Sequence, residues 1–476
     1  MPHARTLSFS PVRLSALAAL WTWLLLQLGG CAALVDTPDY QRPDLPAKQD
    51  WSAALDATRR IDLKWWQAFA DPALDTLMEQ AIAANPNLAV LAARTGVARS
   101  QISQAQARLL PVLNVGGRTD TTSISGATDL GTSNKLGVGG DLTWELDIWG
   151  KARKGVAAQK AAFAATEADW RAGYLVMAAA VSNAYFQIRQ SDAQLDRQHA
   201  AIARAEEILD LLQRMHQRGL IAETRLLQQD AELARLRAGV LELQRVRALT
   251  VNALATLTGQ VAGEFALPST QDLPPIEPVQ VPTGLPAQML NRRPDLVAAE
   301  YRLLQSVQLE GQSRLAQLPT IGLTALGGSA SYGLSDLLKT WTGSLSSVVQ
   351  FPVFNPNVRA QIKASQAQVQ VAEAEYRVAV FKAFEEVENT LVNLANRNAQ
   401  ARQLQSRLDK LNQVRKRTLA QLELGLVSRL EVLERERSLL DADQAVLANR
   451  WQRLNDSVSL FKALGGGWDP QTVGAD

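Results

Sequence analysis

The longest periodic pattern in the chain covers residues 357–424. Apolar or small side chains recur there at alternating steps of four and three residues, at Val358, Ile362, Ser365, Val369, Ala372 and Tyr376. This spacing is typical of the seam of a coiled-coil helix. Residues 151–217 behave alike, and the only helix-weakening residues in the two stretches are Gly155 and Gly173. We therefore predict two helices of about 67 residues, each roughly 100 Å long at ~1.5 Å per residue.

Shorter helical patterns lie on both sides of these long ones. Residues 222–258 and 428–464 follow the long helices, and residues 72–109 and 285–318 form leading helices in each half. Each is about half as long as a long helix. Two short helices stacked end to end would match one long helix, which predicts four full-length helical columns per chain.

The pattern changes to a period of two after Pro111 and after Pro319. Apolar residues alternate with polar ones from Leu136 to Ile148, and a partner strand begins at Leu113. A second hairpin has the same alternation, beginning at Ile321 and continuing from Trp341 to Val353. Strict alternation is typical of strands that separate two environments, and strands of about ten residues with tryptophan fit a membrane barrel.

One detail of the strands does not fit a simple repeat. The apolar positions are even-numbered near Trp144 and odd-numbered near Val349, although the two halves are offset by an even number. Either a bulge or a slipped alignment would explain the difference. Four strands also cannot close a barrel, since about eight are needed, so the chain must oligomerise if it forms one.

An internal repeat organises the chain. Pro86 matches Pro294, an offset of 294 − 86 = 208, and Gly219 matches Gly425, an offset of 425 − 219 = 206. The period is far longer than that of a solenoid, so it indicates a duplicated unit. We predict a first repeat over 65–266, a proline-rich linker over 267–286, a second repeat over 287–464 and a loose tail over 465–476. The fold class is α+β: long helices plus two hairpins, duplicated.

The first thirty residues resemble an export signal that ends in a lipobox. A basic start is followed by an apolar run too short for a comfortable transmembrane helix, and then by Leu28, Gly29, Gly30 and Cys31. In bacterial lipoproteins this cysteine is lipidated. We expect a signal over 1–30 and a lipid anchor at Cys31 followed by an extended linker over 31–64. The alternative is an ordinary signal with an incidental cysteine.

Composition narrows the function further. The net charge is +2, from 49 basic and 47 acidic residues, which argues against a nucleic-acid partner. Three histidines and one cysteine leave little for a metal site, a thiol centre or a catalytic triad. We therefore expect no enzyme, no metal and no cofactor.

Short motifs along nearly the whole mature chain resemble the outer membrane efflux proteins of the TolC type, in the NodT-like lipoprotein subgroup. The matching pieces begin at Tyr40, Trp65, Asn85, Trp144, Arg292 and Ala383. The resemblance implies a homotrimer with a β-barrel in the outer membrane and an α-helical barrel through the periplasm. It also implies a periplasmic adaptor and an inner-membrane RND-type pump as partners, with small molecules or drugs as cargo. Type I protein secretion and a non-conducting periplasmic coiled-coil scaffold are the alternatives.

The candidate functional residues lie at two turns between long and short helices. Gly219 and Leu220 form the first, Gly425 and Leu426 the second, and the resemblance implies that both contact the adaptor. Beyond the second turn, Arg429, Glu431 and Glu434 match the region where relatives place an acidic periplasmic gate. The alternative for Glu431 is a solvated helix face, paired with Arg435 at i, i+4 spacing.

Overall fold

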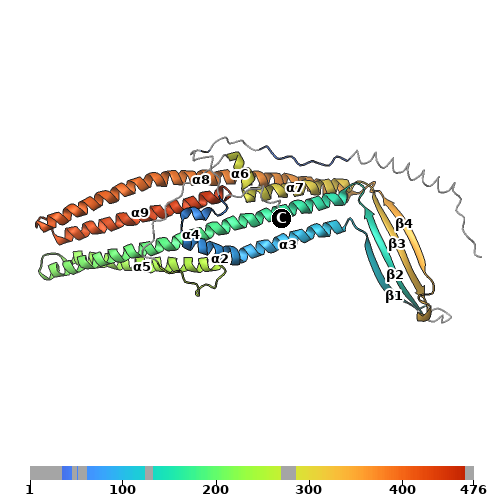
Figure 1. The fold of residues 1–476 in the computed structure, drawn as a ribbon, viewed down its shortest axis with the longest axis horizontal. Coiled ribbons are helices and arrows are strands. Elements are labelled where there is room, and N and C mark those ends of the chain that lie inside the picture. Colours follow the sequence, from blue (N-terminus) through green and yellow to red (C-terminus); the bar gives the residue numbers. More distant parts are fainter. Residues whose placement is uncertain (1–34, 45–50, 52–61, 124–131, 270–285, 467–476) are drawn as a thin grey trace, which may run out of the picture. The chain divides into compact units, whose positions relative to one another are not determined.

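The computed structural model describes residues 35–44, 51, 62–123, 132–269 and 286–466. The order of helix, hairpin, long helix and short helix occurs twice (Figure 1). The elements are η1 (Trp65–Phe69), α2 (Pro72–Ala84), α3 (Pro86–Ala107), β1 (Val112–Ser123), β2 (Thr132–Leu146), α4 (Lys151–Gln217), α5 (Glu223–Leu257), α6 (Pro286–Arg292), α7 (Pro294–Leu315), β3 (Thr320–Ser331), η2 (Leu334–Asp336), β4 (Thr342–Gln350), α8 (Pro356–Glu423) and α9 (Arg429–Ala463). The predicted α+β class with an internal duplication is confirmed.

The chain packs as two compact units. Among the described residues, one unit comprises 35–44, 95–165 and 299–376, and it contains the whole sheet. The other comprises 51, 62–94, 166–298 and 377–466, within which α4 runs beside α5 and α8 beside α9 (Figure 1). Within the described ranges, no helix has the length and apolar character that a membrane span requires.

Each predicted leading helix is in fact two helices. The chain leaves the helical conformation at Asn85, whose ψ is 119°, and α3 starts at Pro86. It leaves again at Arg293, and α7 starts at Pro294. Proline disfavours the α conformation in the residue before it, yet it fits the first position of a helix. The expectation of unbroken helices over 72–109 and 285–318 was therefore wrong.

The two breaks make matching contacts with the ends of the short helices. Asn85 Nδ2 donates to the carbonyl of Leu257 at 2.8 Å, and Arg293 Nη1 donates to the carbonyl of Ala463 at 3.0 Å. Beyond those carbonyls lie Gly259 and Gly465, with φ of 71° and 91°. A Cβ at Gly259 would overlap the Ala84 carbonyl oxygen, and a Cβ at Gly465 would lie 2.8 Å from that of Arg292. Glycine is therefore required at both sites by conformation and by space.

Only the second break is charged. Arg293 is buried and forms ion pairs with Asp295 at 2.7 Å and with Glu386 at 2.9 Å. Burial lowers the pKa of the Arg293 guanidinium, but the two carboxylates outweigh burial, so its pKa lies above the ordinary value. At the first break, the neutral Asn85 has no such ion pairs. Its side-chain oxygen accepts hydrogen bonds from the backbone N–H groups of Asn87 and Leu88, at 2.9 and 3.1 Å.

The four strands form one antiparallel sheet in the order β1-β2-β3-β4. Paired residues share a face of the sheet, so Leu113, Leu142, Ala325 and Leu345 lie on one face. Asn114 and Asp141 lie on the other face and are joined by a hydrogen bond of 3.0 Å. The sheet thus has a mainly apolar face and a more polar one.

The strand register resolves the mismatch between even and odd apolar positions. Leu113 corresponds to Ile321, at the offset of 208 given by the prolines (321 − 113), and their partners are Leu142 and Val349. The offset between these partners is 349 − 142 = 207, one less than the offset of 208 between Leu113 and Ile321. Pairing from β3 to β4 is continuous from Thr320 to Gly328, so a slipped alignment and not a bulge is responsible. A single residue is lost between the paired strands of the second hairpin.

An aromatic core surrounds η1. Trp65 and Trp66 are each 2% exposed; Trp65 stacks on Phe461 with ring centroids 5.0 Å apart, and Phe69 contacts Phe186 edge-on at 5.0 Å. Beside them, the Tyr185 hydroxyl donates to the Asp71 carboxylate at 2.6 Å. Burial and this hydrogen bond raise the pKa of Tyr185 to about 12. The two tryptophans are therefore packing residues.

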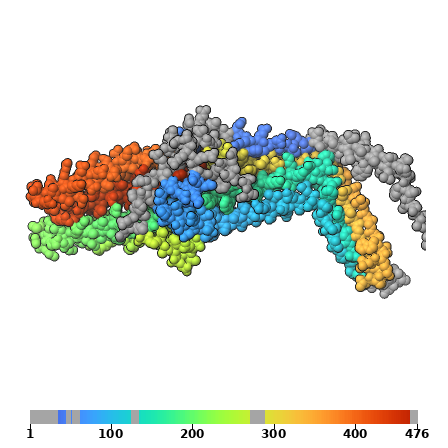
Figure 2. All heavy atoms as spheres, viewed as in Figure 1, coloured from blue at the N-terminus to red at the C-terminus, as the bar shows by residue number. Residues whose placement is uncertain are grey.

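The described part of the N-terminal linker packs on α7 (Figure 2). The Tyr40 hydroxyl donates to Glu300 at 2.9 Å, and Arg42 pairs with the same carboxylate at 2.9 Å. The Tyr40 ring lies against Leu303 and Val307. Burial, followed by the bond to Glu300, raises the pKa of the Tyr40 hydroxyl. The motif that begins at Tyr40 thus serves as a docking segment.

Candidate gate at the helix turns

Both helix turns have the same backbone geometry. Gly219 and Gly425 have φ of 75° and 72°. The next residue in each turn donates its N–H five residues back, from Leu220 to Met215 at 3.0 Å and from Leu426 to Gln421 at 2.9 Å. These bonds define the Schellman motif, in which glycine adopts the left-handed conformation. Apart from each glycine and its two chain neighbours, no heavy atom of the described residues would lie within 4 Å of a Cβ at either position, so conformation alone demands glycine here.

Each turn exposes a leucine. Leu220 is 64% exposed and Leu426 is 70% exposed. A cluster of buried apolar side chains joins α4, the first turn, α5 and α9. Its members are Ile208, Leu212 and Leu433, with Ile221, Leu226 and Leu430 packed against them. The first turn is therefore anchored by apolar packing through Ile221, while Leu220 beside it stays exposed.

The predicted gate residues lie in the first two turns of α9. Ser428 caps this helix by accepting from the backbone N–H of Glu431 at 3.3 Å. Glu431 pairs with Arg435 at 3.4 Å, which is the i, i+4 contact of the solvated-face alternative. Glu434 pairs with Arg225 of α5 at 3.9 Å. Within one chain, each acidic side chain of the predicted gate thus already has a cationic partner.

Further ion pairs connect the first repeat to α9. Arg429 pairs with Glu207 at 3.2 Å, Arg204 with Glu436 at 3.0 Å, and Arg197 with Asp443 at 2.5 Å. Of these residues, sequence reasoning singled out only Arg429. The partners in each pair belong to different repeats, so no local spacing could have indicated them. Together they form an ionic ladder between α4 and α9.

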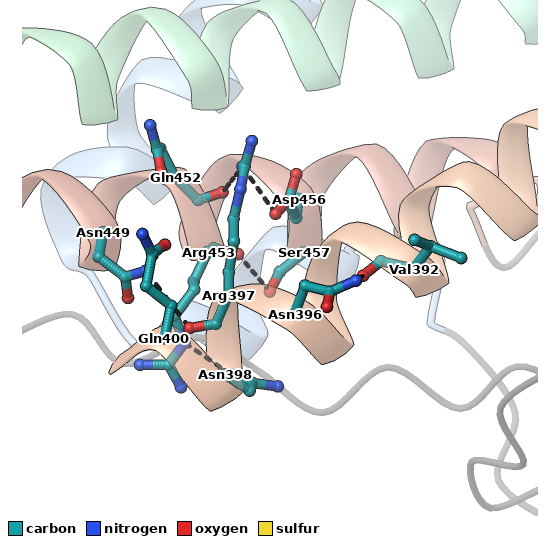
Figure 3. Close-up of polar contacts among 10 residues, drawn as sticks. All are labelled: Val392, Asn396, Arg397, Asn398, Gln400, Asn449, Gln452, Arg453, Asp456 and Ser457. Atoms are coloured by element: carbon teal, nitrogen blue, oxygen red, sulfur yellow. Dashed lines mark hydrogen bonds and ion pairs between the residues drawn. The ribbon is translucent and has the colours of Figure 1, made fainter. Parts of the chain in front are cut away.

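A polar network continues between α8 and α9 (Figure 3). Arg397 donates to the backbone carbonyl of Gln452 at 3.0 Å and pairs with Asp456 at 2.7 Å. Burial raises the pKa of the Asp456 carboxyl, and Arg397 opposes that effect only in part. Asn449 donates to Gln400 at 2.9 Å. The two helices of the second repeat are therefore held by buried polar contacts as well as by apolar packing.

One contact of this network has a counterpart in the first repeat. Arg453 Nε donates to Asn398 Oδ1 at 2.6 Å. At the equivalent positions of the first repeat, Arg247 Nε donates to Asp192 Oδ1 at 2.5 Å. The Asp192 side chain is 3% exposed, and it also lies 3.5 Å from Arg189. The duplicated position thus carries a buried carboxylate in one repeat and a neutral amide in the other.

Cys31 lies outside the described residues. The ranges that the structure describes contain no group of three or more histidine, cysteine, aspartate or glutamate side chains able to hold a metal ion.

Residues 77–260 and 285–466 match the family described as outer membrane efflux protein. The chain is 30% identical over 468 residues to the probable efflux pump outer membrane protein TtgC of Pseudomonas putida, with 94% of each chain covered. It is also 30% identical to the probable outer membrane lipoprotein SilC of Salmonella typhimurium, with 93% of this chain and 96% of that protein covered.

Solved structures agree with these relatives. The outer-membrane channel OprN has a TM-score of 0.80 at 28% identity, covering 92% of this chain and 100% of that one. CusC, whose structures concern transmembrane channel formation, has a TM-score of 0.79 at 27% identity, covering 90% and 99%. The likeness therefore extends over at least nine tenths of the chain.

Proposed function

Because the chain belongs to the outer membrane efflux protein family, we propose that three copies form the exit duct of a tripartite efflux pump. The chain itself is an outer membrane efflux channel, and the family consists of channel proteins and not of enzymes. In the proposal it conducts small molecules passively, after delivery by a periplasmic adaptor and an inner-membrane RND-type pump. The efflux roles named for TtgC and CusC favour this over protein secretion or a scaffold.

An exposed apolar stripe on α8 supports assembly into a ring. Val378, Phe381 and Val392 are each at least half exposed. The positions of α4 that are equivalent to Phe381 and Val392 in the repeat are Leu175 and Phe186, and both are buried.

In the first repeat, other parts of the same chain cover this face. Phe186 packs against Phe69, and Leu175 lies against Gly466, just beyond α9. In the proposal, the next copy covers the matching face of α8, so the contacts run head to tail and close a ring. Three copies supply twelve strands, which is enough to close a barrel.

The ends of the chain have assignments of their own in this proposal. Residues 1–30 are the export signal, Cys31 carries the lipid, and residues 31–64 link the lipid to the first repeat over 65–266. The linker over 267–286 joins it to the second repeat over 287–464, and the tail is 465–476. The docking of Tyr40 and Arg42 on α7 supports the role of the linker as an attached tether.

The gate proposal assigns Glu431 and Glu434 to the periplasmic aperture, with Arg429 beside them. Three copies around one axis would bring six carboxylates together. These carboxylates would attract cations and repel one another. The pairs with Arg435 and Arg225 within each chain reduce that charge. Adaptor contact at Gly219, Leu220, Gly425 and Leu426 would then strain the ionic ladder between α4 and α9.

Planar-bilayer recording of the purified full-length protein tests both the channel function and the gate at Glu431 and Glu434. The wild type should migrate as a heat-sensitive trimer and conduct. The double variant Glu431→Ala with Glu434→Ala should conduct more and be blocked less by divalent cations, because the acidic ring is gone. The matched control removes two other acidic residues near the turns, Glu223→Ala with Glu423→Ala, and should resemble the wild type.

The outcomes distinguish a failure of the channel function from a failure of the gate assignment. A trimer that never conducts would contradict the channel function itself. Conductance and block that stay unchanged in the Glu431 and Glu434 variant would remove both residues from the gate and leave the channel intact.

A further inference from the structure

A hollow of about 500 Å³ lies at the junction between the sheet and the helices. It forms where β2 leads into α4 and where α7 leads into β3. The residues that matter for its chemistry are Val35, Trp149, Lys154, Ala157, Leu315 and Leu318. All of them belong to the same compact unit as the sheet.

The floor of the hollow is apolar, and its side chains are held in place by packing and by a hydrogen bond. Leu315 and Leu318 are both buried within the chain around them. Trp149 is held in place because its indole Nε1 donates to the carbonyl of Pro319 at 2.6 Å. Val35 and Ala157 complete the apolar lining. A floor of this kind suits a hydrocarbon chain.

The basic residues at this junction differ in how they are paired. Arg153 pairs with Asp147 at 3.2 Å, and Lys151 pairs with Glu145 at 2.7 Å. Lys154 forms no ion pair or side-chain hydrogen bond with any residue that the structure describes. Its stem passes over Gly311, where the absence of a side chain leaves it room. The hollow therefore combines an apolar floor with one uncompensated ammonium group.

Its position in the fold places this site at a membrane surface. The channel is located in the outer membrane, and the hollow lies at the strand ends from which the helices continue. In the proposed exit duct, on which this inference rests, those ends face the periplasm, where the headgroups of the inner leaflet lie. Tryptophan is enriched at such interfaces, and basic side chains there attract anionic headgroups.

We propose that the hollow binds a glycerophospholipid of the inner leaflet of the outer membrane. Its phosphate contacts the Lys154 ammonium, and an acyl chain lies on Leu315 and Leu318. The rival occupant is the lipid carried by Cys31, since Val35 lines the hollow and four residues can reach at most roughly 14 Å. That lipid carries no phosphate and would leave Lys154 uncompensated, so the charge favours a phospholipid.

Native mass spectrometry of the delipidated full-length protein in detergent provides the test. Phosphatidylglycerol should bind about tenfold more tightly than diacylglycerol, which has the same chains and no phosphate, because a charge-assisted contact is lost. Lys154→Glu should weaken phosphatidylglycerol binding by at least about tenfold and leave diacylglycerol binding unchanged. Ala157→Trp, which fills the floor, should weaken the binding of both lipids.

The control is Lys160→Glu, which makes the same charge change on the exposed surface of α4, outside the hollow. It should bind phosphatidylglycerol like the wild type, and every variant is first shown to migrate as the heat-sensitive wild-type oligomer. Equal effects of Lys154→Glu and Lys160→Glu would overturn the site. So would full displacement of the lipid by inorganic phosphate, which would make it a site for free anions.

Photo-crosslinking in membranes separates the two lipid sources. Phosphatidylglycerol with a diazirine in its acyl chain should label peptides that contain Leu315 or Ala157, and Lys154→Glu should reduce the label. If the lipid on Cys31 fills the hollow, the label falls elsewhere and does not respond to Lys154→Glu, and the proposal is wrong.

Discussion

The breaks before Pro86 and Pro294 achieve the same geometry with different side chains. Asn85 and Arg293 each end a helix and each donate to the last-turn carbonyl of a short helix. Asn85 is a neutral cap, whereas Arg293 also collects Asp295 and Glu386. Comparison of the two shows which part of a duplicated unit is fixed. The backbone contact and the glycine opposite it are retained, while the charge has changed.

The largest effect should come from the glycines that both breaks share. Gly259→Ala should cost about 3 kcal/mol or more, because a positive φ and overlap with the Ala84 carbonyl add together. Gly465→Ala should cost somewhat less, since the oxygen it meets is 2.8 Å away. Denaturant unfolding followed by circular dichroism gives both values.

Gly219→Ala is the matched control for these variants. It has a similar φ of 75° in open space and should cost only about 1 kcal/mol. If Gly259→Ala were no worse than Gly219→Ala, close backbone approach would not be the common requirement of the two breaks.

Converting one break into the other should have the next largest effect. Arg293→Asn should cost about 2–3 kcal/mol, because a buried side chain loses its ion pairs with two half-exposed carboxylates and its hydrogen bond to Ala463. Asn85→Ala should cost about 1–2 kcal/mol, from a lost helix cap and a lost hydrogen bond. Comparable losses in the two variants, measured by the same denaturant unfolding, would show that the charges at the second break add nothing.

The pH dependence of stability sharpens the same comparison. Burial alone would raise the pKa of Asp295, but Arg293 lowers it below the ordinary value. This carboxylate therefore adds stability that is present above its ordinary pKa and is lost as the pH falls through its lowered folded pKa. Unfolding measured across that acidic range should show the loss in the wild type and not in Arg293→Asn.

Exchanging the polar pair in the helices includes the smallest expected effect, that of Asn398→Asp. Asp192→Asn gives the first repeat the amide of the second and should cost about 2 kcal/mol, because Arg189 and Arg247 lose a buried counter-charge. Asn398→Asp makes the opposite exchange at a less buried site and should change stability by less than about 1 kcal/mol. Equal effects in the two directions would mean that burial does not distinguish the repeats here.

Much of the fold was predictable because its signals are local. A helix over 151–217 agrees with α4 at both ends, since a seam of apolar residues and the following Gly219 mark it clearly. The breaks at Asn85 and Arg293 were missed because periodicity alone does not show that Pro86 and Pro294 begin new helices. Proline at the first position of a helix was the available signal, since a helix was correctly expected to begin at Pro72.

The candidate site was predictable only in part. Gly219 and Gly425 predict the two turns, because glycine readily adopts the positive φ that ends a helix. Both residues have a positive φ in the structure. The partners of Arg429 and Glu434, which are Glu207 and Arg225, come from the other repeat. Such pairs depend on how helices distant in sequence pack, so no local spacing could specify them.

The residue lost between β3 and β4 shows where such a chain can change length during evolution. A deletion within a strand would turn every later side chain to the opposite face of the sheet. A deletion in the turn between two strands leaves both faces intact and alters only the end of the hairpin. The two repeats could therefore come to differ in the length of the hairpin without turning over either face of the sheet.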